Sequence, residues 1–323
     1  MITKIYSFIQ KHLLVNENDT VLIGLSGGPD SVFLTHILKQ YQEKVQFKII
    51  LAHLNHGWRE ESIKDEQFCV NLAKSLDLPI EVAKISELSV SIKFNGSQEE
   101  VGRLYRRYFF DQVKKRYNAT AIALAHTYDD QQENFFIRLL RGASLTGLTG
   151  IQQKKDRYIR PLLETKKIYI LEFLKYKSIQ YCVDKSNFSE DFLRNRIRKN
   201  VIPAIQKSDD RFDINFLKTL SNLQKAESFL ENLAKETLEQ ITVKTDGKES
   251  IYTKDLSKQP EVMQHRIVVL WLCKNEVRFV ASTSLIKEIL RFLLSARGGS
   301  HLLYNTWTIE KKHGLANIKT KDQ

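Results

Sequence analysis

The sequence predicts an α/β fold, with a doubly wound parallel sheet in the N-terminal part and a mainly helical C-terminal part. Short Val/Ile/Leu runs alternate with helical patterns through roughly the first 150 residues, which is typical of parallel strands covered by helices on both faces. From about residue 212 the apolar spacing becomes mainly helical. A chain of 323 residues is too long for one ordinary core. We therefore expect two domains, at residues 1–208 and 209–323.

Four strands and four helices are predicted in the first half of the chain. The strands are expected at residues 20–25, 47–54, 78–82 and 120–125, and the helices at 30–40, 61–76, 97–117 and 129–141. Ligands of such sheets bind beyond the carboxyl ends of the strands. Ser26, His53 and His126 each begin a segment at such an end, so we expect these three segments to meet.

Glycines and helical spacing predict the structure of the chain after residue 141. Residues 142–150 contain three glycines and suit either a mobile lid or an ordered connection. Helices are expected near 166–176 and at 216–238, 259–273 and 283–294, and β-prone patches occur within 298–318.

Composition limits the classes of function. The chain is 42% hydrophobic and 27% charged, and no apolar run reaches the roughly 18 residues of a membrane span, so we expect a soluble protein that does not enter a membrane. The N-terminus shows helical spacing instead of a signal peptide's apolar region, which predicts a cytoplasmic protein. The formal charge is +12, and residues 154–200 carry 13 Lys and Arg against 6 Asp and Glu. This basic segment indicates either a docking site for a polyanion or a solvated, lysine-rich surface.

The most informative motif is Ser26-Gly27-Gly28-Pro29-Asp30-Ser31, which joins an apolar run to a helix. Glycine lets the backbone turn tightly and approach a ligand, and the first amides of a helix carry a partial positive charge. The serines add hydroxyl donors, and Asp30 adds a carboxylate that could hold a divalent cation facing phosphates. The lysine that closes the common nucleotide-triphosphatase loop is absent. We expect all six residues to bind a nucleotide, with a ligand-free strand-to-helix turn as the alternative.

Acidic residues follow the fourth predicted strand. Asp129 and Glu133 are four residues apart, which places both carboxylates on one face of a helix's first turn. With Asp130 they could bind a cationic amine or a metal, and helix capping is the alternative for Asp129 and Asp130. His126 precedes them, and His53-Leu54-Asn55-His56 follows the second strand. No third metal ligand is near those histidines, so we expect His53 and His126 to shape the nucleotide pocket.

Arginines occur in two further candidate segments. Arg103 and Arg106 lie on one side of a predicted helix that also contains Glu99, and a planar guanidinium suits phosphate charge. The second segment is Arg194-Asn195-Arg196-Ile197-Arg198-Lys199, in which Arg194, Asn195 and Arg198 are the candidate substrate ligands. A solvated charged helix face is the alternative for both segments.

Together these motifs resemble tRNA(Ile)-lysidine synthase, a family of the ATP-pyrophosphatase superfamily. The motifs of that family are matched in order at residues 26–31, 53–56, 99–106, 126–133, 138–142, 160–163, 184–187 and 194–198. The resemblance covers residues 20–205, and beyond about Phe212 it rests on length and helical pattern only. Thr127, Asn134 and Arg107 depart from it, at positions where histidine, threonine and tyrosine are common.

The resemblance implies an N-type ATP pyrophosphatase-like catalytic domain followed by a tRNA-binding domain. An enzyme of this kind adenylates the wobble cytidine in the CAU anticodon of an isoleucine tRNA, and free L-lysine then displaces AMP to give lysidine. ATP and Mg²⁺ are the implied cofactors, with Asp30 and Asp130 on the metal and Arg103 stabilising charge during adenylation. Asp129 and Glu133 are expected to bind the lysine amine. The basic segment is expected to anchor the tRNA, and a homodimer stays open beside a monomer.

Two other functions stay open. A tRNA thiolase of the same superfamily would need C-x-x-C pairs or a catalytic cysteine. Cys69, Cys182 and Cys273 form no such pair, and we expect buried free thiols, none of them at a loop beside the nucleotide site. A non-catalytic RNA-binding protein with a degenerate nucleotide fold is the second alternative, and the intact loop with Asp30 argues against it.

Overall fold

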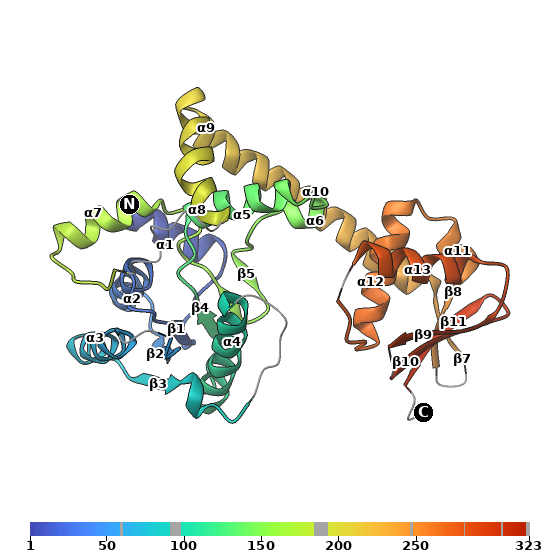
Figure 1. The fold of residues 1–323 in the computed structure, drawn as a ribbon, viewed down its shortest axis with the longest axis horizontal. Coiled ribbons are helices and arrows are strands. Elements are labelled where there is room, and N and C mark those ends of the chain that lie inside the picture. The colour runs from blue at the N-terminus through green and yellow to red at the C-terminus, as the bar shows by residue number, and fades with distance from the viewer. Residues whose placement is uncertain are drawn as a thin grey trace. The chain divides into compact units, whose positions relative to one another are not determined.

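The chain forms two compact units, Met1–Leu217 and Lys218–Gln323, in the computed structural model (Figure 1). The structure describes residues 1–58, 61–90, 98–183, 193–245, 248–280, 282–304 and 306–320. The border between the units falls inside helix α10 (Phe212–Ile241), which begins shortly after the predicted domain division at residue 208.

A six-stranded sheet forms the centre of the first unit. Its strands are β1 (Thr20–Gly24), β2 (Lys48–Asn55), β3 (Ile80–Lys84), β4 (Ala121–Ala123), β5 (Lys154–Lys155) and β6 (Tyr158–Ile159). They lie in the order β3-β2-β1-β4-β6-β5, and every neighbouring pair is parallel except β5 and β6. The chain therefore winds outward from β1 through β2 and β3 and then continues on the other side of β1 with β4. The predicted doubly wound α/β sheet is confirmed, and its switch point lies between β1 and β4.

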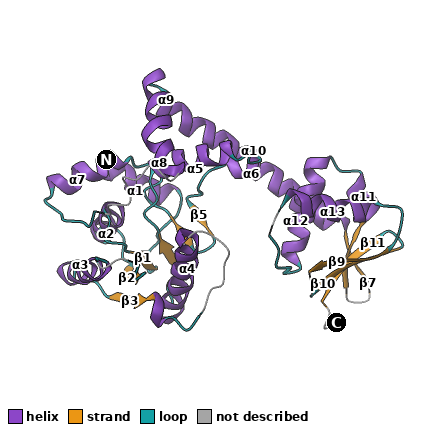
Figure 2. Ribbon diagram, viewed as in Figure 1, coloured by secondary structure: helices purple, strands orange, loops and turns teal. Residues whose placement is uncertain are grey.

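Helices connect and follow these strands (Figure 2). Their bounds are α1 (Ile2–Lys11), α2 (Pro29–Tyr41), α3 (Ser62–Ser75), the 3₁₀-helix η1 (Ile85–Glu87), α4 (Gln98–Arg116), α5 (Tyr128–Leu140), α6 (Leu145–Leu148), α7 (Lys167–Tyr176), α8 (Leu193–Arg196), the π-helix η3 (Ile197–Val201) and α9 (Ile202–Ser208). The four strands and four helices predicted for the first half are present, with ends shifted by at most two residues.

The central strands divide the apolar core between the two faces of the sheet. Val21 and Ile23 of β1 pack into a cluster with α1, α2, α3 and α7, whereas Leu22 packs into a second cluster with Phe109 and Phe110 of α4. All three β1 residues are 0% exposed. Because successive side chains of a strand point to opposite faces, an uninterrupted apolar run is what a sheet covered on both sides requires. Burial of each such side chain contributes about 1.5–3 kcal/mol.

The glycine-containing segment at 142–150 connects α5 to β5. The segment includes the short helix α6. Ile151, the residue after the segment, is fixed by the Gln131 side chain of α5. Gln131 donates to the Ile151 carbonyl and accepts from the Ile151 N–H, both at 2.7 Å. This two-way bond to the backbone anchors the residue after the segment on α5.

The second unit combines helices with an antiparallel sheet. Its helices are the remainder of α10, α11 (Thr253–Ser257), α12 (Glu261–Lys274) and α13 (Thr283–Leu294). The strands are β7 (Thr242–Thr245), β8 (Lys248–Tyr252), β9 (Gly299–Tyr304), β10 (Trp307–Lys312) and β11 (Leu315–Thr320), in the order β7-β8-β11-β10-β9. The predicted helical character holds, and the β-prone patches form β9–β11. The β7–β8 hairpin is an addition to the prediction. Among all the helices described, none is long and apolar enough to cross a membrane.

Candidate functional site

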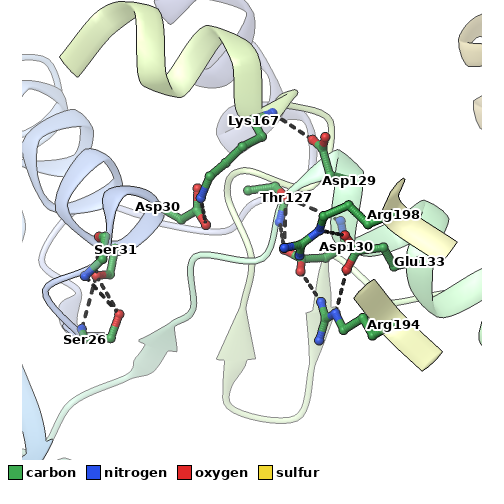
Figure 3. Close-up of polar contacts among 11 residues, drawn as sticks. Ser26, Asp30, Ser31, Thr127, Asp129, Asp130, Glu133, Lys167, Arg194 and Arg198 are labelled. Atoms are coloured by element: carbon green, nitrogen blue, oxygen red, sulfur yellow. Dashed lines mark hydrogen bonds and ion pairs between the residues drawn. The ribbon is translucent and has the colours of Figure 1, made fainter. Parts of the chain in front are cut away.

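The loop that follows β1, residues 26–31, is fixed by hydrogen bonds between its own serines (Figure 3). We call it the phosphate loop. Ser31 Oγ accepts from the Ser26 N–H at 3.1 Å, lies 3.0 Å from Ser26 Oγ and donates to the Gly28 carbonyl at 3.0 Å. Gly27 has a φ of +82°, which L side chains rarely adopt. Gly28 is the N-cap of α2, and Pro29 is its first residue. The first amides of α2 are thus available to an anion at the carboxyl end of β1.

Asp30 places a carboxylate in the first turn of α2. Its Oδ2 forms an ion pair with Lys167 Nζ, whereas Oδ1 is buried and has no hydrogen-bond partner among the described residues. Burial raises the pKa of the Asp30 carboxyl, and the Lys167 ammonium acts against that rise. A buried carboxylate oxygen without a partner is a fitting ligand for Mg²⁺ at the edge of a phosphate site.

Two histidines lie at the carboxyl ends of the neighbouring strands. His53 Nδ1 lies 2.9 Å from the Leu25 carbonyl oxygen, so Nδ1 carries the proton and Nε2 is an acceptor. Burial lowers the pKa of His53, and it lowers the pKa of His126 to about 4. His53 Nε2 and His126 Nδ1 are buried and have no partner in the part of the chain that the structure describes. Both rings are therefore neutral near pH 7, each with one nitrogen available to a polar ligand.

The first turn of α5 orients its carboxylates through the backbone. Thr127 is the N-cap residue, and Asp130 Oδ2 accepts from its N–H at 2.7 Å while Thr127 Oγ1 accepts from the Asp130 N–H at 3.4 Å. Asp130 therefore caps the N-terminus of α5, as the alternative interpretation of the sequence predicted. Asp129 Oδ2 accepts the backbone N–H of Lys167 at 2.7 Å, so Asp129 reaches across to the start of α7.

Two arginines cover Glu133, which is 0% exposed. Glu133 Oε2 accepts from Arg194 Nε and Oε1 accepts from Arg198 Nε, each at 2.5 Å (Figure 3). Arg194 also forms an ion pair with Asp130. The predicted substrate arginines therefore lie on the predicted lysine-binding carboxylate, and Asp130 uses both of its oxygens within the protein.

A π-helical turn accompanies this pairing. Arg194 belongs to α8 and Arg198 to η3, where the Ile202 N–H donates to the carbonyl of Ile197, five residues earlier. Pro203 follows and has no N–H to continue the ordinary helical pattern. Single π-turns inside helices recur at functional sites, and this one contains Arg198, one of the two arginines that meet at Glu133.

Asp129 is the carboxylate of α5 that forms no ion pair among the described residues. Burial raises the pKa of Asp129, and the neighbouring charges of Asp130 and Glu133 raise it further. Around these three carboxylates stand two guanidinium groups, those of Arg194 and Arg198. One negative charge is left over, so the arrangement is complementary to one more cation.

The two arginines predicted on α4 differ in their surroundings. Arg106 Nη2 lies 3.3 Å from His56 Nε2, and the Arg106 charge contributes to the lowered pKa values of His53 and His126. Arg103 is exposed. The structure therefore brings Arg106 to the pocket more directly than Arg103.

The remaining predicted site residues and one hollow are not part of this arrangement of loop, histidines and carboxylates. The motif match at residues 184–187 falls outside the described residues, as does the Glu99 side chain. Asn195 of α8, a predicted substrate ligand, is buried, at 9% exposure. A hollow of about 400 Å³ at the amino ends of β2 and β3, lined by residues such as Lys39 and Tyr117, contains none of the predicted site residues.

The prediction that no cysteine lies at a loop beside the nucleotide site is wrong. A Cβ atom added to Gly27 would stand 3.2 Å from Cys182 Sγ and 3.4 Å from Cys69 Sγ, and the Cys182 N–H donates to the Gly27 carbonyl at 2.9 Å. These contacts join segments far apart in sequence, which no local pattern reveals. Burial raises the pKa of the Cys182 thiol to about 12 and also raises that of Cys69, so both stay protonated. Cys273 is exposed, contrary to the expected buried thiol.

Two lysines that no motif singled out begin α7. Lys166 is its N-cap and Lys167 its first residue, at the end of the helix dipole where cations are disfavoured. Lys166 Nζ forms an ion pair with Asp213 of α10, and Lys167 Nζ with Asp30 of α2. Residues that contradict local electrostatics often mark functional sites, and this contradiction is the signal that could have identified them.

Comparison with known proteins identifies a family and relatives that share the predicted resemblance. Residues 1–205 match the family described as the PP-loop domain. The chain is 30% identical over 316 residues to a tRNA(Ile)-lysidine synthase of Clostridium acetobutylicum, covering 97% of this chain and 62% of that protein. It is 36% identical over 222 residues to a tRNA(Ile)-lysidine synthase of Clostridium perfringens, covering 68% of this chain and 47% of that protein. The chain thus spans less than two thirds of the length of these curated relatives.

A solved structure shares the fold. The tRNA thiolase NcsA of Methanococcus maripaludis superimposes with a TM-score of 0.59 at 16% identity, covering 69% of this chain and 78% of that one. At this identity the likeness shows the fold alone.

Replacing Glu133 by glutamine should destabilise the first unit, because Arg194 and Arg198 lose the charge that they share. We expect the free energy of unfolding to fall by about 2–3 kcal/mol. The two arginine side chains are 41% and 45% exposed and can be rehydrated, which limits the loss. Urea denaturation of Glu133→Gln, Arg198→Gln and the double variant measures the effect. The double variant should lose less than the sum of the single variants, and strictly additive losses would contradict the interaction.

Asp129→Asn should stabilise the protein at neutral pH. Burial and two neighbouring carboxylates raise the folded-state pKa of Asp129, so the ionised form costs stability above its unfolded pKa of about 3.9. The Tm difference between variant and wild type should therefore grow as pH rises through the folded-state pKa and vanish below about pH 4. Asparagine can still accept the Lys167 N–H. Glu164→Gln, at an exposed site, is the control. A lower Tm for Asp129→Asn at pH 7 would refute the argument.

Proposed function

The chain belongs to the PP-loop domain family, and from this premise we propose that it ligates free lysine to the wobble cytidine in the CAU anticodon of an isoleucine tRNA. The reaction consumes ATP, passes through an adenylated tRNA and forms lysidine. The observation that carries the proposal is the meeting, at one switch point, of a phosphate loop containing Asp30 and a carboxylate cluster with one uncompensated negative charge. ATP and a cationic amino acid are the two small substrates that such a pair of sites suits.

In the first half-reaction the cytidine O2 attacks the α-phosphorus of ATP, an O–P bond forms, and pyrophosphate leaves with the bonding electrons. The phosphate-loop amides and the hydroxyls of Ser26 and Ser31 bind the phosphates. Asp30 would hold Mg²⁺ through its unpartnered Oδ1, and the cation would neutralise charge on the departing phosphates. Asp130 Oδ1 already accepts from Arg194, so Asp130 would join the metal through a remaining lone pair. Arg103 or its neighbour Arg106 would stabilise the charge that develops on the α-phosphate.

In the second half-reaction the lysine amine attacks C2 of the cytidine. A C–N bond forms, the C–O bond to AMP breaks, and AMP leaves with the electron pair while the amine gives up its proton. Asp129 is the first contact for the ammonium group, because it lacks an ion pair among the described residues. Glu133 can contribute a second contact, since each carboxylate oxygen that accepts an arginine N–H keeps another lone pair.

The basic segment supplies the contact to tRNA. Residues 154–200 carry a net charge of +7, and Arg196 and Lys199 are exposed beside the buried pairing of Glu133. Such cations bind phosphates and position the tRNA without reading its sequence. We propose that the second unit is the tRNA-binding domain that helps to select the isoleucine tRNA.

A tRNA thiolase is the second candidate, and one observation favours it: Cys69 and Cys182 contact Gly27 of the phosphate loop. A sulfur-transferring cysteine acts as a thiolate, however, and burial holds the pKa of Cys182 at about 12. We therefore assign these thiols a packing role.

The wild-type protein should incorporate labelled lysine into an isoleucine tRNA with a CAU anticodon, with release of AMP and pyrophosphate. Asp30→Asn should reduce AMP release at least about 100-fold, because the residue that holds the cation is lost. Its affinity for tRNA should stay within about twofold, since the basic segment is unchanged. A methionine tRNA with the same anticodon is the control. Absence of lysine incorporation by the wild type, with AMP release intact, would contradict the lysine assignment.

Cys182→Ala should keep lysine incorporation within about twofold of wild type, because a protonated packing thiol takes no part in the reaction. Cys273→Ala, at an exposed site, is the matched control. Transfer of labelled sulfur to tRNA by the wild type, together with its loss in Cys182→Ala, would establish the thiolase instead.

A further inference from the structure

The phosphate loop contains no cation of its own. Residues 24–31 include neither lysine nor arginine, and the nearest lysine along the chain, Lys39, lies in the last turn of α2, at the opposite end of that helix. The amides and hydroxyls of such a loop give partial charges only, whereas a pyrophosphate group carries several full negative charges.

A lysine reaches the loop from another segment. Lys167, 137 residues after Asp30 in the chain, forms an ion pair through Nζ with Asp30 Oδ2 (Figure 3). Its side chain is 32% exposed, so it is not sealed in the core.

The backbone of Lys167 is fixed from two sides. Its N–H donates to Asp129 Oδ2 at 2.7 Å, which connects the start of α7 to the first turn of α5. Helix α7 packs on α2 through Phe173 and Phe33, whose ring centroids lie 5.1 Å apart edge to face, and Ile170 is fully buried in the same cluster. The ammonium group is thus held by rigid helices beside the loop, as a preorganised binding group requires.

We propose that Lys167 is the phosphate-binding lysine of this loop and that it binds the β- and γ-phosphates of ATP, the part that leaves as pyrophosphate. This inference rests on the proposed function and adds a substrate-binding residue to it. Lys167 neutralises Asp30 through their ion pair, and phosphate oxygens replace that carboxylate when ATP binds. The position of a cation at the disfavoured end of the α7 dipole is explained by this role, because the Asp30 carboxylate or a phosphate offsets the repulsion.

Lys166 provides a matched control one residue away. Its side chain is 36% exposed, it carries the same charge, and it also forms an ion pair with an aspartate. That aspartate is Asp213 of α10 and not a residue of the phosphate loop. Lys166→Met and Lys167→Met therefore remove the same charge from neighbouring positions. Only Lys167→Met removes the charge that contacts the phosphate loop.

Calorimetric binding of inorganic pyrophosphate in the presence of EDTA tests the proposal. EDTA removes divalent cations, so Asp30 cannot bind the ligand through a metal. We expect Lys167→Met to weaken pyrophosphate binding about tenfold or more, Lys166→Met to change it less than about twofold, and Lys167→Arg to keep it within about threefold. The Tm of each variant, measured in parallel, reports on folding.

The outcomes separate this inference from the proposed function. Unchanged pyrophosphate affinity in folded Lys167→Met, or equal losses in the two methionine variants, would overturn the role of Lys167 even if the wild type forms lysidine. A lower Tm with full pyrophosphate affinity would show a structural role only and would also overturn it. A wild type that binds pyrophosphate through Lys167 but forms no lysidine would contradict the proposed function and support the phosphate-binding role of Lys167.

Discussion

Carboxylates gathered at one end of a parallel sheet must be matched by cations, and the rest of the site depends on that constraint. Asp30 begins α2 beyond β1, and Asp129, Asp130 and Glu133 lie on α5 beyond β4, so the switch point brings them together. Burial raises the pKa values of Asp30 and Asp129, which shows that ionisation there is unfavourable without partners. The partners come from α7, α8 and η3, all of which follow the sheet in the chain.

The local part of this arrangement could be predicted from sequence. The phosphate loop and the acidic turn are short patterns in which neighbouring residues act together, and the alternation of apolar runs fixes the strands that carry them. The ion pairs of Glu133 join residues 61 and 65 positions apart, and the pair of Lys167 with Asp30 spans 137. Such pairs depend on where whole helices pack, so sequence spacing does not reveal them. The contact of Cys182 with Gly27 was missed for the same physical reason.

The arginines illustrate how one cluster can serve two purposes. As part of the folded protein, Arg194 and Arg198 offset the charge of a fully buried glutamate. As partly exposed side chains in a basic segment, they are also accessible to a polyanion from solvent. The π-turn that contains Arg198 begins after Arg194 and does not end the helix. A sequence reading that assigns carboxylates to lysine and arginines to phosphate treats as separate two sets of residues that are in contact.

The adjacent lysines of α7 tie the phosphate loop to a second polar network. Lys167 contacts Asp30, and its neighbour Lys166 contacts Asp213, which also accepts hydrogen bonds from Tyr128 at 2.9 Å and Gln132 at 3.1 Å. Tyr128 and Gln132 belong to α5, the helix that carries the acidic cluster. The phosphate loop, helix α5 and the first turn of α10 therefore all contact the same two residues, Lys166 and Lys167. Because the N–H of that segment is held by Asp129, a ligand that draws Lys167 from Asp30 acts on a side chain whose backbone stays in place, which is the property a phosphate-binding lysine needs.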